Sequence, residues 1–168
     1  MKKPVIIFIL GFKGSFLRQH GNNRLVWPSP WQIYFGNKSL QLPIQPNQKG
    51  LLELYSSEVL HKITLVPGLF EIKFYDYWLK KLKRNFGKTH KIIGFDYDWR
   101  LDNFEAAQKL DQLIKQLNQH HDRAITLIAH SMGGLIASYY LRYGSQDFES
   151  AQENWRGAEQ IDHMIFAG

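Results

Sequence analysis

Residues 129–134, with the sequence Ala-His-Ser-Met-Gly-Gly, constrain the fold more than any other segment of this chain. They directly follow a short apolar run typical of a buried strand, residues 124–129, and directly precede a helix-like stretch, residues 135–142. A strand, a sharp turn of small residues around a serine and then a helix form the arrangement called a nucleophile elbow. Bulky side chains beside such a turn would clash, so Gly133 and Gly134 fit it well.

Alternating strand and helix patterns elsewhere predict the rest of a sheet. Residues 5–10 are a continuous apolar, β-branched run, which is typical of a strand buried on both faces in a parallel sheet. Residues 91–96 and 161–167 are interpreted as two further strands. Because strands that alternate with helices form parallel sheets with right-handed crossovers, we expect an α/β fold with helices on both faces.

Two helices are predicted between those strands. Apolar side chains recur at helical spacing from Phe74 to Phe86, and Gly87 is a suitable C-terminal cap. Asp102 can cap a second helix, with Glu105 in the capping-box position three residues later. The apolar stripe of this second helix consists of Phe104, Ala107, Leu110, Leu113, Ile114 and Leu117.

Residues 20–60 interrupt this pattern. They hold four of the six prolines and several aromatic side chains, so we expect a lid- or cap-like excursion of irregular structure from one domain, residues 1–168. The aromatic residues are interleaved with prolines, and they form either a lipid-facing surface or a small core under the loop. They are Trp27, Trp31, Tyr34 and Phe35.

The composition is that of one globular domain. The 168 residues, 44% of them apolar, suffice for a core, and no apolar run approaches the ~20 residues of a membrane-spanning helix. No signal peptide is recognised, so we expect a cytoplasmic protein, with membrane association left open. The absence of cysteine excludes disulfides and thiolate metal sites. The net charge of +6 is interpreted as a solvated basic face without a nucleic-acid partner, because no nucleic-acid-binding motif accompanies the cations at residues 80–84.

Ser131 is the candidate nucleophile. A serine hydroxyl attacks only if a base removes its proton and hydrogen-bond donors hold the negative charge that develops on the substrate oxygen. The backbone N–H of Met132 supplies one donor of such an oxyanion hole. We assign the second donor to the N–H of Phe12, in the loop after the first strand, where Gly11 and Gly14 let the backbone approach a substrate closely.

No histidine is assigned as the base. His130 adjoins Ser131 in the turn, so its ring cannot reach the hydroxyl, and we expect it to pack or hydrogen-bond beside the turn. This kind of fold delivers its base on a loop after a later strand, and none of the other histidines lies there. They are His20, His61, His90, His120, His121 and His163.

Residues 96–100, with the sequence Asp-Tyr-Asp-Trp-Arg, follow a predicted strand at the same edge of the sheet. Two carboxylates close to an arginine suggest acid–base chemistry or a metal site. The favoured interpretation is structural: a salt bridge and hydrogen bonds form a cluster, covered by aromatic side chains, that we call the knot.

Four segments together carry a family resemblance. They are residues 4–15, 25–28, 96–100 and 128–134. In order and sequence they resemble the lecithin:cholesterol acyltransferase-like group of α/β-hydrolases, which includes phospholipases and phospholipid-dependent acyltransferases. The run at 96–100 is more discriminating than the serine turn, which many lipases share. Ala129 stands where the common motif has Gly, and Leu10 stands where the family often has Pro.

The resemblance implies an α/β-hydrolase fold, here a partial parallel sheet that ends at the strand after the helix following the serine. It implies transfer of an acyl group from a phospholipid to Ser131 and then to water or an alcohol, with no cofactor, and oxyanion roles for Phe12 and Met132. In this fold the acid and the histidine follow the nucleophile. Only 37 residues (168 − 131) follow Ser131, so we assign neither and expect the N-terminal half of such an enzyme.

The sequence therefore predicts a serine-dependent lipid ester hydrolase or acyltransferase that is incomplete as this chain. Its expected partners are a lipid or ester substrate, with a membrane surface and a complementary C-terminal chain as candidates. The alternative is a non-catalytic remnant, or one half of a split enzyme that binds lipid or a partner chain. A nucleotide-binding domain is disfavoured, because residues 11–15 match neither the P-loop nor the dinucleotide fingerprint.

Overall fold

The computed structural model describes residues 3–29, 40, 54–60, 62–66, 70–73, 75–119 and 123–168, with only the backbone of residues 62–66 and 70–73. The strands are β1 (Val5–Ile9), β2 (Ser15–Gln19), β3 (Leu25–Trp27), β4 (Leu54–Val59), β5 (Lys62–Val66), β6 (Phe70–Lys73), β7 (Lys91–Phe95), β8 (Ile125–His130) and β9 (His163–Ala167). The helices are α2 (Asp76–Phe86), α3 (Asn103–Asn118), α4 (Met132–Tyr143) and the short 3₁₀ helix η2 (Ala158–Gln160).

Four parallel strands form the central sheet, in the order β7-β1-β8-β9. Val5 of β1 lies opposite Lys91 of β7 on one side and Ile125 of β8 on the other. All five residues of β1 are buried, as a continuous apolar run requires when strands flank it and helices cover it. The predicted parallel sheet and its four strands are confirmed.

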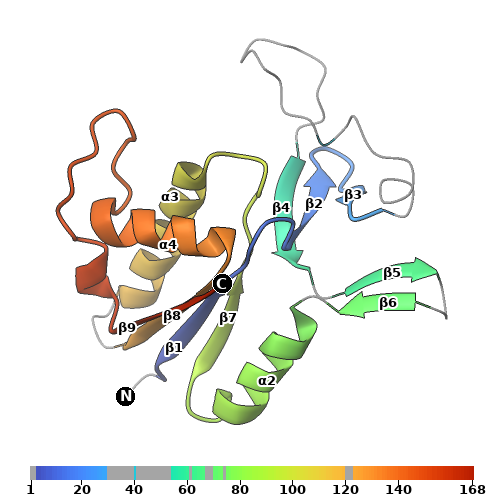
Figure 1. Ribbon diagram of the computed structural model, residues 1–168, viewed down its shortest axis with the longest axis horizontal. Helices are drawn as coiled ribbons and strands as arrows, with labels where there is room; N and C mark the ends of the chain where they lie inside the picture. Colours follow the sequence, from blue (N-terminus) through green and yellow to red (C-terminus); the bar gives the residue numbers. More distant parts are fainter. Residues whose placement is uncertain are drawn as a thin grey trace.

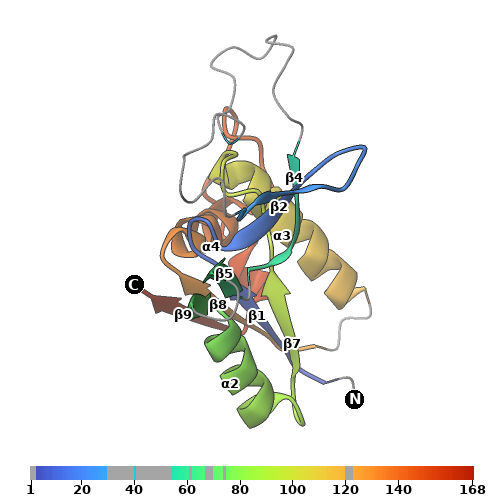
Figure 2. The ribbon, with the colours of Figure 1, turned by 90° about the vertical axis from the view of Figure 1, so that its right-hand side faces the viewer.

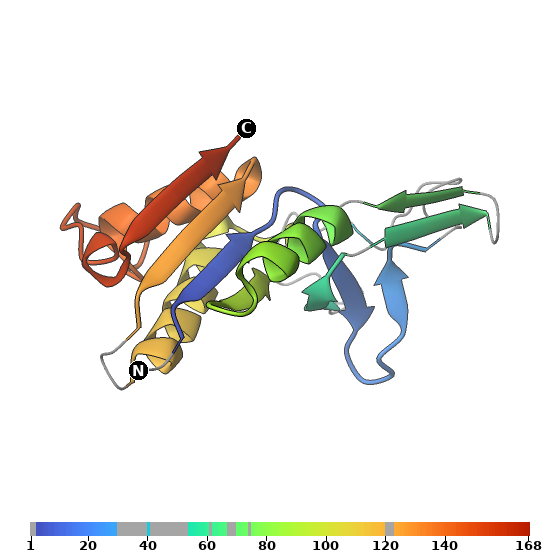
Figure 3. The ribbon, with the colours of Figure 1, turned by 90° about the horizontal axis from the view of Figure 1, so that it is seen from below.

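Helices cover both faces of this sheet, as expected. α3 and α4 pack against each other on one face, and α2 lies on the other face beside β7 (Figure 1; Figure 3). The chain is thus a partial α/β fold. None of the helices in the described part of the chain is both long and apolar enough to cross a membrane.

α3 begins at its predicted cap. The side chain of Asp102 accepts a hydrogen bond from the N–H of Phe104 at 3.0 Å, which satisfies one of the first-turn donors. Ala107, Leu110 and Ile114 of the predicted stripe are completely buried, and the other members are half-buried. The stripe therefore forms the packing face of α3.

α2 confirms the predicted helix, but its aromatic side chains do not form the packing face. Tyr77 and Trp78 are 57% and 53% exposed, whereas Leu79 is buried. Leu79 packs where β7 carries Gly94, since a Cβ added to that glycine would lie 3.5 Å from the leucine Cδ1. The inward stripe of α2 consequently runs through Leu79 and Leu82, one helical turn apart.

The predicted irregular excursion at residues 20–60 contains regular structure. β3 and β4 pair with β2 in a small antiparallel sheet, which lies beyond the carboxyl end of β1 (Figure 2). A separate hairpin, β5–β6, was not expected from the sequence. Register shifts interrupt all of these pairings, so the alternation of apolar and polar residues that marks a strand is weak here.

Much of the excursion lies outside the described residues, including Trp31, Tyr34 and Phe35. The lid or cap role and the single-domain boundary stay predictions. Trp27 is described: it is only 8% exposed and its ring lies 5.7 Å from that of Trp99. For this residue the interpretation as a small core under the loop is confirmed.

Candidate active site

Ser131 lies in the turn between β8 and α4, as the sequence predicts. Its backbone has φ 53° and ψ −123°, in the half of φ space that L-residues other than glycine rarely adopt, and its side chain is exposed. Two hydrogen bonds hold this conformation. The N–H of Ser131 donates to the carbonyl of Ala167 on β9 (2.9 Å), and the N–H of Gly134 donates to the carbonyl of Ser131 (2.8 Å).

Gly133 brings the start of α4 against the end of β1. A Cβ at this position would lie 2.6 Å from the carbonyl oxygen of Leu10 and 2.7 Å from that of Ile9, closer than any side chain can approach. The absence of a side chain here therefore lets the Ser131 turn sit directly beside the loop that follows β1. Gly134 is less constrained, since its nearest neighbour would be the ring of Phe166 at 3.4 Å.

The loop after β1 reaches the Ser131 turn at Gly11. A Cβ added to Gly11 would lie 3.1 Å from the Cβ of Ser131, so the two backbones are in close contact. Phe12 follows directly and is 57% exposed. In the described part of the chain its N–H donates to no acceptor, and neither does that of Met132, a first-turn amide of α4 that has no intrahelical acceptor.

A buried tyrosine, which the sequence analysis missed, ties this loop to the Ser131 turn. The hydroxyl of Tyr75 accepts a hydrogen bond from the N–H of Gly11 (2.9 Å) and lies 2.9 Å from Nδ1 of His130. Burial raises the pKa of Tyr75, although the hydrogen bond from Gly11 opposes the shift, so the phenol stays neutral and keeps its proton. We assign that proton to the contact with Nδ1 of His130, an arrangement that requires the ring proton of His130 to be on Nε2.

The prediction that His130 hydrogen-bonds beside the turn is confirmed. The described residues contain three further histidines, His20, His90 and His163. Neither these side chains nor any described carboxylate hydrogen-bonds to Ser131. His61, His120 and His121 lie outside the described residues.

Residues 96–100 hold the same loop from the opposite side, where β7 ends. The hydroxyl of Tyr97 donates to the carbonyl of Leu10 (2.8 Å) and its N–H donates to the hydroxyl of Ser15 (3.0 Å). The indole N–H of Trp99 donates to the carbonyl of Ser15 (3.3 Å). The ring of Phe12 packs edge-on against that of Trp99 at 5.0 Å. Both ends of the loop after β1 are thereby fixed to β7.

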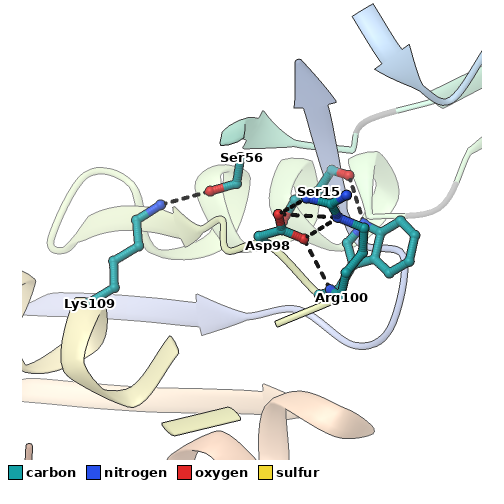
Figure 4. A network of polar contacts seen from close by, with 6 residues as sticks. Ser15, Ser56, Asp98, Arg100 and Lys109 are labelled. Atoms are coloured by element: carbon teal, nitrogen blue, oxygen red, sulfur yellow. Dashed lines mark hydrogen bonds and ion pairs between the residues drawn. The ribbon is translucent and has the colours of Figure 1, made fainter. Parts of the chain in front are cut away.

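The carboxylates of this segment are engaged in ion pairs. Asp98 accepts from Nε and Nη2 of Arg100 at 2.9 and 2.6 Å, and both side chains are at least nine-tenths buried (Figure 4). Asp96 pairs with Lys109 of α3 at 2.8 Å. The same ammonium donates to the hydroxyl of Ser56 on β4, the contact that Figure 4 shows. Within the described residues no metal-binding group of three His, Cys, Asp or Glu side chains occurs. The interpretation of residues 96–100 as a structural knot is confirmed.

Comparison with known proteins agrees with this arrangement. The family model for lecithin:cholesterol acyltransferase matches residues 37–168. A lecithin-cholesterol acyltransferase-like 4 protein of Arabidopsis thaliana is 23% identical over 174 residues, which cover 89% of this chain and 32% of the relative. An uncharacterized protein of Saccharomyces cerevisiae is 26% identical over 139 residues, which cover 82% of this chain and 20% of the relative.

The chain thus spans about a third of the length of one of these relatives and a fifth of the other. The match extends through the knot at residues 96–100, the Ser131 turn and β9, whereas the loop after β1 precedes it. The chain belongs to the lecithin:cholesterol acyltransferase family, whose fold is that of the α/β-hydrolases.

Proposed function

We propose that this chain is the nucleophile-bearing part of a serine-dependent lipid esterase or acyltransferase, with Ser131 as the nucleophile. The observation that carries the proposal is the backbone of Ser131, an exposed residue held at φ 53° between a strand and a helix. Strain of this kind persists only where the surroundings impose it, and it concentrates at functional sites. Membership of a lipid acyltransferase family supports a lipid ester as the substrate.

In the proposed reaction, Oγ of Ser131 attacks the ester carbonyl carbon as a base removes the hydroxyl proton. The carbonyl oxygen becomes an oxyanion, and the N–H groups of Met132 and Phe12 donate hydrogen bonds to it. The ester C–O bond then breaks and the alcohol leaves with a proton. Water or a second alcohol attacks the acylated serine, takes the acyl group and restores the hydroxyl.

Two features support the oxyanion roles. Met132 begins α4, where the free first-turn amides and the helix dipole both favour a negative charge. The loop that carries Phe12 touches Ser131 through Gly11 and is fixed by Tyr75 on one side and Tyr97 on the other. A donor on a loop held in this way needs little rearrangement when the oxyanion forms, which is what makes such stabilisation effective.

The base and the acid belong to the proposal but are assigned to no residue of this chain. His130 is already engaged with the hydroxyl of Tyr75 through Nδ1, at 2.9 Å. We propose that a histidine and an acid reach Ser131 from another segment of the protein or from a second chain. A serine site without its base retains only ~10³–10⁴-fold catalysis over water, so the 168-residue chain alone should be nearly inactive.

Fluorophosphonate labelling tests this proposal, because the reagent modifies activated serine hydroxyls. The whole protein is labelled and the modified residue is located by peptide mass, with Ser131→Ala as the loss variant. Ser138→Ala is the matched control, since it removes another serine of the same helix. We expect labelling at Ser131 that Ser138→Ala preserves. Equal labelling and ester hydrolysis in Ser131→Ala would overturn the proposal.

β9 favours a second candidate, in which the chain is one half of a two-chain assembly. It is the last strand in the sheet order, and Ile165 and Phe166 are 50% and 57% exposed. A sheet edge with apolar side chains is a template for further pairing. Labelling of Ser131 only after a complementary C-terminal chain is added would support this candidate, and rapid labelling of the isolated chain would contradict it.

A further inference from the structure

The amino edge of the central sheet brings cations from three separate segments together. β7, β1 and β8 are adjacent and parallel, and a basic residue lies at the start of each or two positions before it. Lys91 is the first residue of β7, Lys3 precedes β1 and Arg123 precedes β8. The backbone N–H of Lys91 donates to the carbonyl of Pro4 at 2.8 Å, so the strand starts are held at one level.

α2 and the turn after it add to this group from one side. Lys83, Gly87, His90 and Ile92, together with the cations of the three strand starts, line a cavity of about 420 Å³. Clefts for small ligands measure roughly 300–1,000 Å³, so the cavity can hold one. No acidic side chain is among the described residues that line it.

The lysines of this cavity are not neutralised by neighbours. In the described part of the chain, Lys3, Lys83 and Lys91 form no ion pair. Elsewhere the pattern differs, since Lys80 and Lys109 each pair with an aspartate at 2.7 and 2.8 Å. The cavity therefore gathers positive charge that the protein leaves uncompensated.

Arg123 also lines the cavity. Its Nε is buried and has no hydrogen-bond partner among the described residues. On its other side the arginine borders a depression that also contains Glu159 and Asp162, but it forms an ion pair with neither. A buried donor without an acceptor is unfavourable, and the described residues supply none to this guanidinium nitrogen.

The geometry points to this cavity as a binding site for a phosphate group, which we call the amino-edge site and define by Lys3, Lys83, Lys91 and Arg123. Phosphate offers several acceptor oxygens and a charge that offsets the mutual repulsion of these cations. The group can belong to a soluble phosphate ester or to the headgroup of an anionic phospholipid. At about 3.3 Å per residue along β8, the amino-edge site lies roughly 25 Å from Ser131, so it is separate from the proposed reaction.

Two probes distinguish these sources in the whole protein. Glycerol 3-phosphate is titrated while the backbone amide resonances at the strand starts are followed by NMR. Cosedimentation then compares vesicles of phosphatidylcholine with vesicles that also contain about 20 mol% phosphatidic acid. The test variant combines Lys91→Gln with Arg123→Gln. The control combines Lys115→Gln with Arg142→Gln, which removes the same charge from exposed cations elsewhere.

We expect the test variant to weaken binding of at least one probe by about ten-fold or more, and the control to stay within about three-fold, at ~0.1 M salt. Binding of both probes supports a general phosphate site, and binding of acidic vesicles alone supports a headgroup site. Absence of binding to either probe, or an equal loss in both variants, would overturn the inference. Lys91→Gln alone, at an exposed residue, replaces the double variant if that variant melts early. Neither readout depends on catalysis, so failure of the Ser131 proposal would leave this inference standing.

Discussion

Tyr75→Phe tests the hydrogen-bonded link between α2, the loop after β1 and the Ser131 turn. The substitution removes one oxygen and keeps the ring, which is buried and packs edge-on against Phe8 at 5.7 Å. The lost hydroxyl accepts from the N–H of Gly11 and contacts Nδ1 of His130, both at 2.9 Å. The change therefore isolates two hydrogen bonds while it preserves the packing of the tyrosine.

The two lost hydrogen bonds differ in their cost to the stability of the fold. Gly11 is buried, so its N–H would be left without an acceptor, and an unsatisfied buried donor costs about 1–3 kcal/mol. His130 is half-buried, so water can replace the hydroxyl at Nδ1 at little cost. We expect a total loss of about 1–3 kcal/mol in the free energy of unfolding, equivalent to a fall in Tm of roughly 2–12 °C for a domain of this size.

Urea denaturation of Tyr75→Phe and of a matched control, Tyr77→Phe, measures this cost. Tyr77 carries the same hydroxyl two residues later, but it is 57% exposed, and its ring lies against that of Trp78 and the ammonium of Lys81. We expect the control to match the unmodified protein. Nitrogen NMR should also show the ring proton of His130 on Nε2 in the unmodified protein. Equal stability of the two variants, or a ring proton on Nδ1 of His130, would refute the reasoning.

Three further predictions concern the surroundings of the site, and urea denaturation measures each. Gly133→Ala should lower the free energy of unfolding by about 1–3 kcal/mol, because its Cβ would lie 2.6 Å from a backbone oxygen just after β1. Gly134→Ala should be neutral or stabilising, because its nearest neighbour is 3.4 Å away. Equal effects of the two variants would contradict the predicted contact. Arg100→Gln should lower the free energy of unfolding by about 3–5 kcal/mol, because it leaves the carboxylate of Asp98, which is 6% exposed, without its cation. A loss below about 1 kcal/mol would show that the ion pair is not structural. Burial first and the neighbouring Tyr75 second raise the pKa of Tyr97 above its ordinary value of 10.0, so at high pH the folded protein keeps a proton that the unfolded chain loses. The free energy of unfolding should therefore be constant below about pH 10 and fall above it. Tyr97→Phe should reduce this fall.

The features that the sequence predicts correctly are those that local patterns determine. The strand at residues 5–10 and the helix capped by Asp102 each follow from a run or a periodicity within a few residues, and the structure has both. The closeness of the Gly11 loop to Ser131 also followed from the sequence, because parallel strands in one sheet bring their carboxyl ends to the same edge.

The features that the sequence did not reveal depend on contacts between distant segments. Gly11 and Tyr75 are 64 positions apart, and nothing in the residues around Tyr75 distinguishes it from the two aromatic residues that follow, which are exposed. Which aromatic side chain turns inward depends on how α2 packs against β7, a contact between segments that helical periodicity does not reveal. The pairing of β2 with β4 likewise joins strands separated by most of the excursion, and its register shifts hide the strand pattern.

The contacts that hold the loop after β1 show which parts of the proposed reaction depend on the base. The loop after β1 is fixed by Tyr75 at the N-cap of α2, by Tyr97 just after β7 and by the close approach at Gly133 of α4. All of these contacts lie within this chain, and none of them uses Ser131 Oγ. The proposed nucleophile and the loop that carries the proposed oxyanion donor Phe12 are therefore positioned without any contact to a base. For the proposed reaction this means that a histidine supplied by another segment would need only to reach the exposed hydroxyl of Ser131, because the loop with the proposed donor Phe12 is held by contacts within this chain.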